Sequence, residues 1–121
     1  MYPPNKISSF FPILPPAVNE NSNPEIHTSI FRENDAFIEG AGIYQNGGTG
    51  LIYWTSFEGN NGYDYGGGLV SYQATIELVN TTFSQNIAGI GSAMSLHSSV
   101  ITIDNSILWG NNGSLFHSPN F

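Results

Sequence analysis

A repeat of about 26 residues is the feature of this sequence that most constrains its fold. Four quartets share one pattern, an apolar residue, two variable residues and an asparagine, and they start at steps of 26, 26 and 25 residues: Phe31 to Asn34, Phe57 to Asn60, Phe83 to Asn86 and Leu108 to Asn111. Five residues before each quartet stands another apolar residue: Ile26, Ile52, Leu78 and Ile103. Self-similarity at a fixed period indicates one structural unit used repeatedly.

The unit is made of strands and turns. Glycine accounts for 14 of the 121 residues and only 9% of the residues are charged, so good helix formers are scarce. After each of the first three quartets a glycine step leads into a short apolar run, at Gly40, Gly66 and Gly91. The period therefore predicts an all-β fold, a right-handed parallel β-helix solenoid of about four coils of 25 to 26 residues, with strands stacked at roughly 4.8 Å.

Stacking turns the repeated apolar residues into two inward columns. We expect a core stack of Phe31, Phe57, Phe83 and Leu108 beside Ile26, Ile52, Leu78 and Ile103. Side chains alternate along a strand, so two residues five apart both face inward only if the chain bends between them. The stretch 79–82 and its equivalent Asn105 to Ser106 are suited to that corner. Gly42, Gly68 and Ala93 mark positions where a larger side chain would crowd the coil.

The repeated asparagines predict a buried hydrogen-bond ladder. An asparagine at one turn position of every coil can pass a side-chain amide bond to the coils above and below, and it can satisfy backbone groups of the turn. We expect Asn34, Asn60, Asn86 and Asn111 to form this structural ladder, and the neighbouring Asn112 to point outward.

The quartets and glycine steps resemble the repeats of polymorphic outer-membrane proteins. The stretch Asn105 to Asn111 is similar to a phrase of right-handed parallel β-helix repeat proteins of the pectin-lyase-like superfamily. The resemblance covers about residues 24 to 116. It implies a secreted or cell-surface protein, hence an extracellular or cell-surface location, in which such repeats form a structural or adhesive segment. It also implies an alternative, a carbohydrate-binding or polysaccharide-degrading fragment similar to pectate lyases.

The repeats occupy residues 24–121 and follow a leader rich in proline and asparagine over residues 1–23, which we expect to be poorly ordered or to form a cap. The apolar run 7–18 faintly resembles a signal peptide but is interrupted by Pro12, Pro15 and Pro16. The last repeat breaks off shortly after Gly113, so we expect a fragment of a longer solenoid whose open edge favours edge-to-edge self-association.

Charge and composition exclude several functions. Two basic residues, Lys6 and Arg32, stand against nine acidic ones, for a net charge of -7, so we expect no nucleic-acid partner. No apolar run is long enough for membrane insertion. Arg32 is expected to pair with Glu33, Asp35 or Glu39. The residues contain no catalytic cluster, and the three histidines, His27, His97 and His117, lie too far apart in sequence to suggest a metal site, so no cofactor is expected.

Aromatic residues provide the best indication of a binding function. Several tyrosines and tryptophans, Tyr44 and Tyr72 among them, exceed what a narrow coil can enclose, and outward aromatic rings are natural contacts for sugars or proteins. The candidate glycan platform consists of Tyr53, Trp54, Tyr63, Tyr65 and Trp109. Surface glycans or proteins are the candidate partners, although the same rings could simply cover turns and stack on neighbouring coils.

Overall fold

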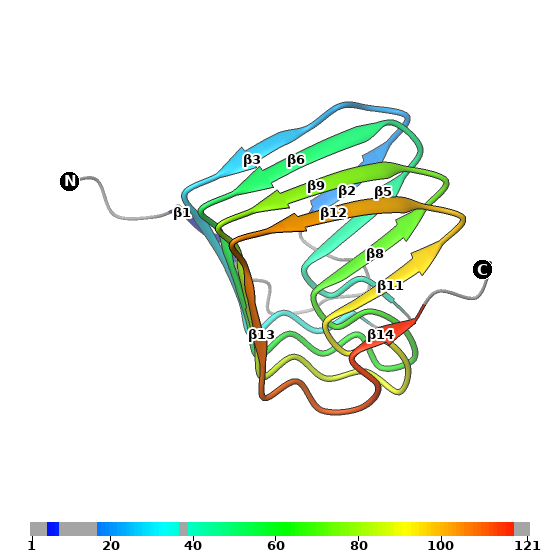
Figure 1. Cartoon of the computed structure of the whole chain (residues 1–121). Helices are drawn as coiled ribbons and strands as arrows, with labels where there is room; N and C mark the ends of the chain where they lie inside the picture. Colours follow the sequence, from blue (N-terminus) through cyan, green and yellow to red (C-terminus); the bar gives the residue numbers. More distant parts are fainter. Residues whose placement is uncertain (1–4, 8–16, 37–38, 118–121) are drawn as a thin grey trace.

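The computed structural model describes residues 5–7, 17–36 and 39–117, and these form a right-handed β-solenoid without helices (Figure 1). Within them, three all-parallel sheets make the three sides of the coil. The first, sheet A, contains β1 (Asn5–Ile7), β4 (Ser29–Arg32), β7 (Ser56–Glu58), β10 (Thr82–Ser84) and β13 (Ile107–Trp109). Sheet B contains β2 (Ala17–Glu20), β5 (Ile43–Asn46), β8 (Leu69–Tyr72), β11 (Met94–His97) and β14 (Phe116–His117). Sheet C contains β3 (Glu25–His27), β6 (Thr49–Tyr53), β9 (Thr75–Val79) and β12 (Val100–Asp104).

The fold class is the one that the repeat predicts, but the described coils make about three turns instead of four. The reason is that four copies of one repeat position are separated by three full turns, as the steps between Asn34 and Asn111 show. Two strands, β1 and β2, lie within residues 1–23 and pair with β4 and β5. Most of the apolar run 7–18 lies outside the described residues.

The strand register brings the repeated apolar residues directly over one another. Phe31 pairs with Phe57, Phe57 with Phe83, and Phe83 with Leu108. Ile26, Ile52, Leu78 and Ile103 form the corresponding column in sheet C. The three phenylalanine rings are fully buried and stack face to face, with ring centroids 5.0 and 4.4 Å apart. These rings form the centre of the apolar core that keeps the sheets together.

The corners of the coil are made by residues in left-handed backbone conformation. Between sheets C and A, φ is positive at Thr28, Trp54, Asn80 and Asn105, one residue in each coil. The predicted bend after β9 is therefore made by Asn80, and it allows Leu78 and Phe83 to face inward together. Asparagine tolerates this conformation, whereas a bulky residue such as Trp54 adopts it only at a cost in free energy.

Glycines occupy positions where the backbone of one coil passes close to the next coil. A β-carbon at Gly68 would lie 2.6 Å from the carbonyl oxygen of Ala93 and 2.6 Å from the ring of Phe83, so close approach requires glycine there. Two residues earlier, Gly66 has a φ of +57°, a backbone conformation that residues with a side chain rarely adopt. The glycine step thus contains two different constraints, one of space and one of backbone angle.

Candidate functional site

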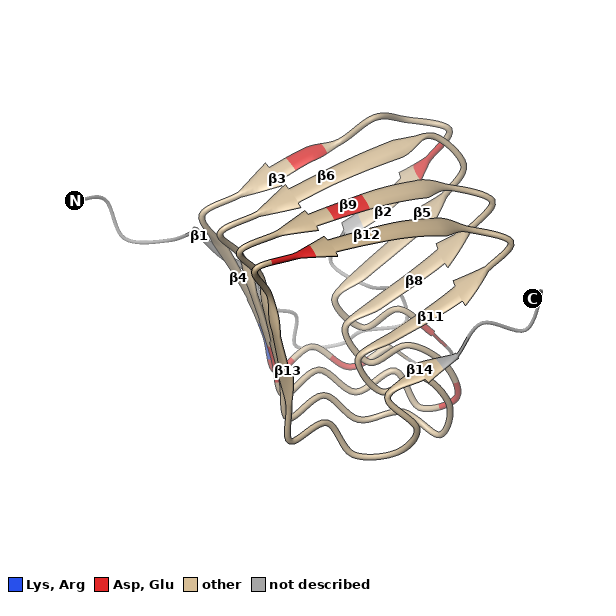
Figure 2. Cartoon of the chain, in the orientation of Figure 1, with Lys and Arg blue, Asp and Glu red and all other residues tan. Residues whose placement is uncertain are grey.

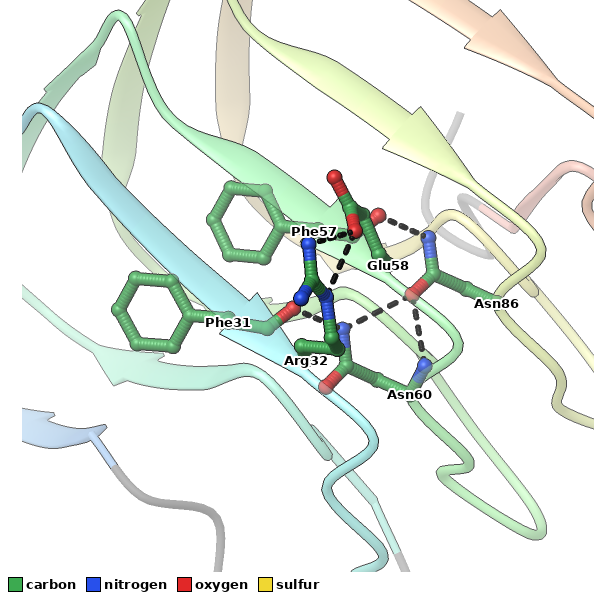
Figure 3. Close-up of polar contacts among 6 residues, drawn as sticks. All are labelled: Phe31, Arg32, Phe57, Glu58, Asn60 and Asn86. Atoms are coloured by element: carbon green, nitrogen blue, oxygen red, sulfur yellow. Dashed lines mark hydrogen bonds and ion pairs between the residues drawn. The ribbon is translucent and has the colours of Figure 1, made fainter. Parts of the chain in front are cut away.

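The asparagine ladder runs through the turn that follows sheet A (Figure 3). The Oδ1 atom of Asn86 accepts from the backbone N–H of Asn60 at 3.0 Å and from its Nδ2 at 2.9 Å. Nδ2 of Asn86 donates to Oδ1 of Asn111 at 2.9 Å and to the carbonyl oxygen of Phe57 at 3.0 Å. The same bonds join Asn34 to Asn60. This confirms the predicted ladder, and Asn112 is exposed as expected.

The ladder explains why an asparagine is needed. Asn34, Asn60 and Asn86 are fully buried, so their amide groups must find partners inside the protein. A carboxamide has both an acceptor oxygen and two donor hydrogens, so one side chain can form hydrogen bonds with the coil above and with the coil below at once. A second column, of hydroxyl groups, closes the corner between sheets C and A, where Thr81 Oγ1 and Ser106 Oγ lie 2.9 Å apart.

Arg32 forms its ion pair with Glu58, so the expected pairing with Glu33, Asp35 or Glu39 is wrong (Figure 3). The Arg32 Nη2 and Nε atoms lie 2.8 and 2.9 Å from Glu58 Oε2. These residues occupy the same register position on adjacent strands, only one strand spacing apart. Glu33 lies beyond the end of β4 with a positive φ. The guanidinium of Arg32 is therefore already paired with a carboxylate.

The residues of the candidate glycan platform lie on different parts of the coil. Tyr53 and Trp54 stand at the end of β6, and Trp109 lies on β13 in another sheet. Tyr63 and Tyr65 belong to the connection between β7 and β8. The structure thus brings Tyr53 and Trp54 together, with Trp109, Tyr63 and Tyr65 placed elsewhere.

A first aromatic patch forms around Tyr53 on the outer face of sheet C. Its ring stacks on His27 at a centroid distance of 5.1 Å and meets Trp54 edge-on at 5.6 Å. The Tyr53 hydroxyl donates to Oε1 of Glu25 at 2.7 Å, and this bond raises the pKa of Tyr53 above its ordinary value. Trp54 is 63% exposed in spite of its positive φ. The patch therefore presents a solvent-facing indole beside a tyrosine whose hydroxyl is bonded to a carboxylate.

A second aromatic cluster lies on the outer face of sheet B. The rings of Tyr72 and His97 stack at 4.2 Å, Tyr44 approaches Tyr72 at 5.7 Å, and Tyr65 meets His97 edge-on at 5.8 Å. The Tyr72 hydroxyl donates to Oε2 of Glu39 at 2.6 Å. Burial, followed by the hydrogen bond to Glu39, raises the pKa of Tyr72 well above its ordinary value. The hydroxyl thus remains a neutral donor to the carboxylate.

The sequence indicated only that some of the aromatic residues, among them Tyr44 and Tyr72, must lie outside the coil, and it did not pair them with histidines. The signal was present, because His27 and Tyr53 are 26 residues apart and Tyr72 and His97 are 25 apart, one repeat in each case. Searching for ring-bearing residues separated by the repeat length would have found both stacks.

Charged groups are spread over the coil rather than gathered (Figure 2). Within residues 5–7, 17–36 and 39–117, no group of three or more His, Cys, Asp or Glu lies together so that it could hold a metal ion. The same described ranges contain no helix with the length and apolar character needed to cross a bilayer.

Comparisons of the chain with protein-family models, with curated proteins and with solved structures find no match. The structure therefore defines the class, a parallel β-solenoid repeat protein with an internal asparagine ladder.

Proposed function

We propose that this chain is a structural or adhesive repeat segment of a secreted or cell-surface β-helix protein, of the pectin-lyase-like kind that its motifs resemble. The observation that carries the proposal is that each coil binds the next coil through its own side chains. Inward positions hold the phenylalanine stack, the turn holds the asparagine ladder, and an outward position joins Arg32 to Glu58. Such repetition supports an extended, rigid body, and it needs no chemistry beyond self-stacking.

Turnover and attachment assays test this proposal. The chain is incubated with pectate and alginate in the presence of Ca²⁺, and the release of unsaturated or reducing sugar ends is measured. We expect no release. In parallel, beads coated with the chain are allowed to settle on surfaces coated with glycan or protein, and attachment above that of uncoated beads supports the adhesive role. Ca²⁺-dependent release of unsaturated ends would instead assign the chain to the polysaccharide-degrading alternative.

Carbohydrate binding is a second candidate function, supported by the patch of Tyr53, Trp54 and His27. A bulky residue at a positive φ is uncommon, and such strain is often retained where a side chain serves a function. The indole of Trp54 faces solvent and meets the ring of Tyr53 edge-on, and the Tyr53 hydroxyl donates to Glu25. An exposed aromatic face with polar groups in the same patch is suited to a sugar ring with several hydroxyl groups.

The two tryptophans of the chain provide a matched test of sugar binding. Trp109 is 58% exposed, close to the exposure of Trp54, but lies on a different sheet. Binding of neutral and acidic oligosaccharides is measured by titration calorimetry for Trp54→Ala and Trp109→Ala. We expect Trp54→Ala to weaken binding about tenfold, the loss of one aromatic stacking contact, and Trp109→Ala to leave it unchanged. Equal effects of the two substitutions would remove Trp54 as the contact.

A further inference from the structure

The outer face of sheet C places a carboxylate on each side of the strand that ends at the aromatic patch. That strand is β6, whose outward residues include Leu51 and Tyr53 and which is followed by Trp54. Strand β3 lies on one side of β6 and strand β9 on the other. Both neighbours have a glutamate in register with Leu51, Glu25 on β3 and Glu77 on β9. We call the outward residues of β3, β6 and β9 the sheet C face.

The net charge of the sheet C face is negative. Figure 2 shows acidic residues on β3 and β9, and a further one, Asp104, on the next strand, β12. The strands of sheet C contain neither lysine nor arginine, and His27 is their one side chain that can become positively charged. Lys6 and Arg32 both belong to sheet A, where Arg32 is already paired. The charge of the face therefore opposes an acidic polysaccharide and favours a cationic ligand.

Both glutamates can accept a bond from a ligand. Glu77 is exposed, and within the described residues no group of the protein bonds to its carboxylate. Glu25 is also exposed, and its Oε1 atom accepts the Tyr53 hydroxyl at 2.7 Å. A carboxylate has several acceptor positions, so this bond leaves Glu25 its charge and its second oxygen. Each glutamate can thus bind an ammonium group.

The distance between the two glutamates is suited to a sugar chain. They stand two strand spacings apart, about 10 Å, with Leu51 between them. In a β-1,4-linked chain each unit is turned over relative to the previous one, so a substituent returns to the same side at every second unit, at a similar distance. An extended peptide instead repeats its side chains on one side at about 7 Å, twice the rise per residue. The spacing therefore favours a sugar chain over a basic peptide.

We infer that the sheet C face binds a cationic amino-sugar chain, such as β-1,4-linked glucosamine with free amino groups. The inference rests on the carbohydrate binding proposed above and names the class of sugar. Ammonium groups of alternate units bind Glu25 and Glu77, while Leu51 contacts the ring between them. The exposed indole of Trp54 packs against the apolar face of a further ring.

Titration calorimetry with three oligosaccharides of equal length tests the class of sugar. The glucosamine oligomer is compared with its N-acetylated form, which has the same backbone and no charge, and with an acidic galacturonate oligomer. Measurements at about pH 6 keep the glutamates ionised and the sugar amines protonated. We expect the glucosamine oligomer to bind about tenfold more tightly than the N-acetylated one, through two solvent-exposed ion pairs, and the acidic oligomer to bind most weakly.

Two substitutions separate the charge from the aromatic contact. Glu77→Gln should weaken binding of the glucosamine oligomer about threefold, the effect of one exposed ion pair, and leave binding of the N-acetylated oligomer unchanged. Trp54→Ala should weaken binding of both. The matched control is Glu33→Gln, which makes the same change of charge at an exposed position outside sheet C. Gln85 occupies the equivalent corner two coils later with a similar φ, so the control is expected to fold and to bind like the native chain.

The possible failures are distinct from one another. Equal affinity for the charged and N-acetylated oligomers, or tighter binding of the acidic one, would overturn the amino-sugar class and leave carbohydrate binding in place. No binding of any oligosaccharide would overturn both, while the structural role of the repeats would stand. Polylysine is titrated in parallel. If it binds more tightly than the glucosamine oligomer and responds to Glu77→Gln but not to Trp54→Ala, the face is a site for basic peptides and the inference is wrong.

Discussion

Replacing Asn86 with alanine removes four hydrogen bonds from the middle of the ladder. Oδ1 accepts two bonds from Asn60, and Nδ2 donates to Asn111 and to the carbonyl oxygen of Phe57. The other groups of Asn60 and Asn111 keep partners, because Asn60 Nδ2 still donates to Phe31 and Asn111 Oδ1 still accepts from the backbone N–H of residue 86.

Two backbone groups lose these bonds, the N–H of Asn60 and the carbonyl oxygen of Phe57. A buried group left unsatisfied costs about 1 to 3 kcal/mol, so we expect Asn86→Ala to lower the free energy of unfolding by about 3 kcal/mol. For a domain of this size, 3 kcal/mol is a large fraction of the total stability, which is typically about 5 to 15 kcal/mol.

Urea denaturation followed by circular dichroism measures this loss. The control is Asn112→Ala, one coil further along the chain, where the side chain is exposed and the expected cost is under about 0.5 kcal/mol. Equal shifts of the two midpoints would refute the ladder as a source of stability. Such a result would leave the repeated asparagines as turn formers whose side-chain bonds contribute nothing measurable.

Three further predictions concern the core, the strained corner and the tyrosine cluster. Phe83→Asp introduces a charge into the ring stack and should cost several kcal/mol, on the order of 4, measured by the same denaturation. Trp54→Asn places at the corner the residue type found at Asn80, and it should stabilise the fold by about 1 kcal/mol while it weakens sugar binding about tenfold, as Trp54→Ala does; a loss of stability would show that the indole is structural. The pKa of Tyr72 is higher in the folded state than in the unfolded chain, so its contribution is fully present below about pH 10 and is lost as the pH rises through the folded value. Stability in alkaline solution should therefore fall less steeply for Tyr72→Phe than for the native chain, and identical slopes would contradict the assignment.

The sequence by itself determined which residues of adjacent coils lie directly over one another. Once the period is about 26 residues and the units are strands, each residue lies over the one a single repeat away. This reasoning predicts the Asn60 to Asn86 bonds and the Phe57 to Phe83 stack without coordinates. It would also have predicted the Arg32 to Glu58 pair, had the repeat been applied to charges instead of near neighbours along the chain.

Only the tertiary structure decided the contacts that cross between different positions of the repeat. Tyr72 bonds to Glu39, which is 33 residues away and belongs to the loop before sheet B, so no whole number of repeats connects them. The same holds for the distribution of the aromatic residues, because the period places residues in columns but does not say which side of the coil a loop residue covers. Stacking is set by the spacing of strands along the axis, which is the same for every coil. Lateral contacts depend on how each loop folds over its sheet, and that is a matter of packing in three dimensions.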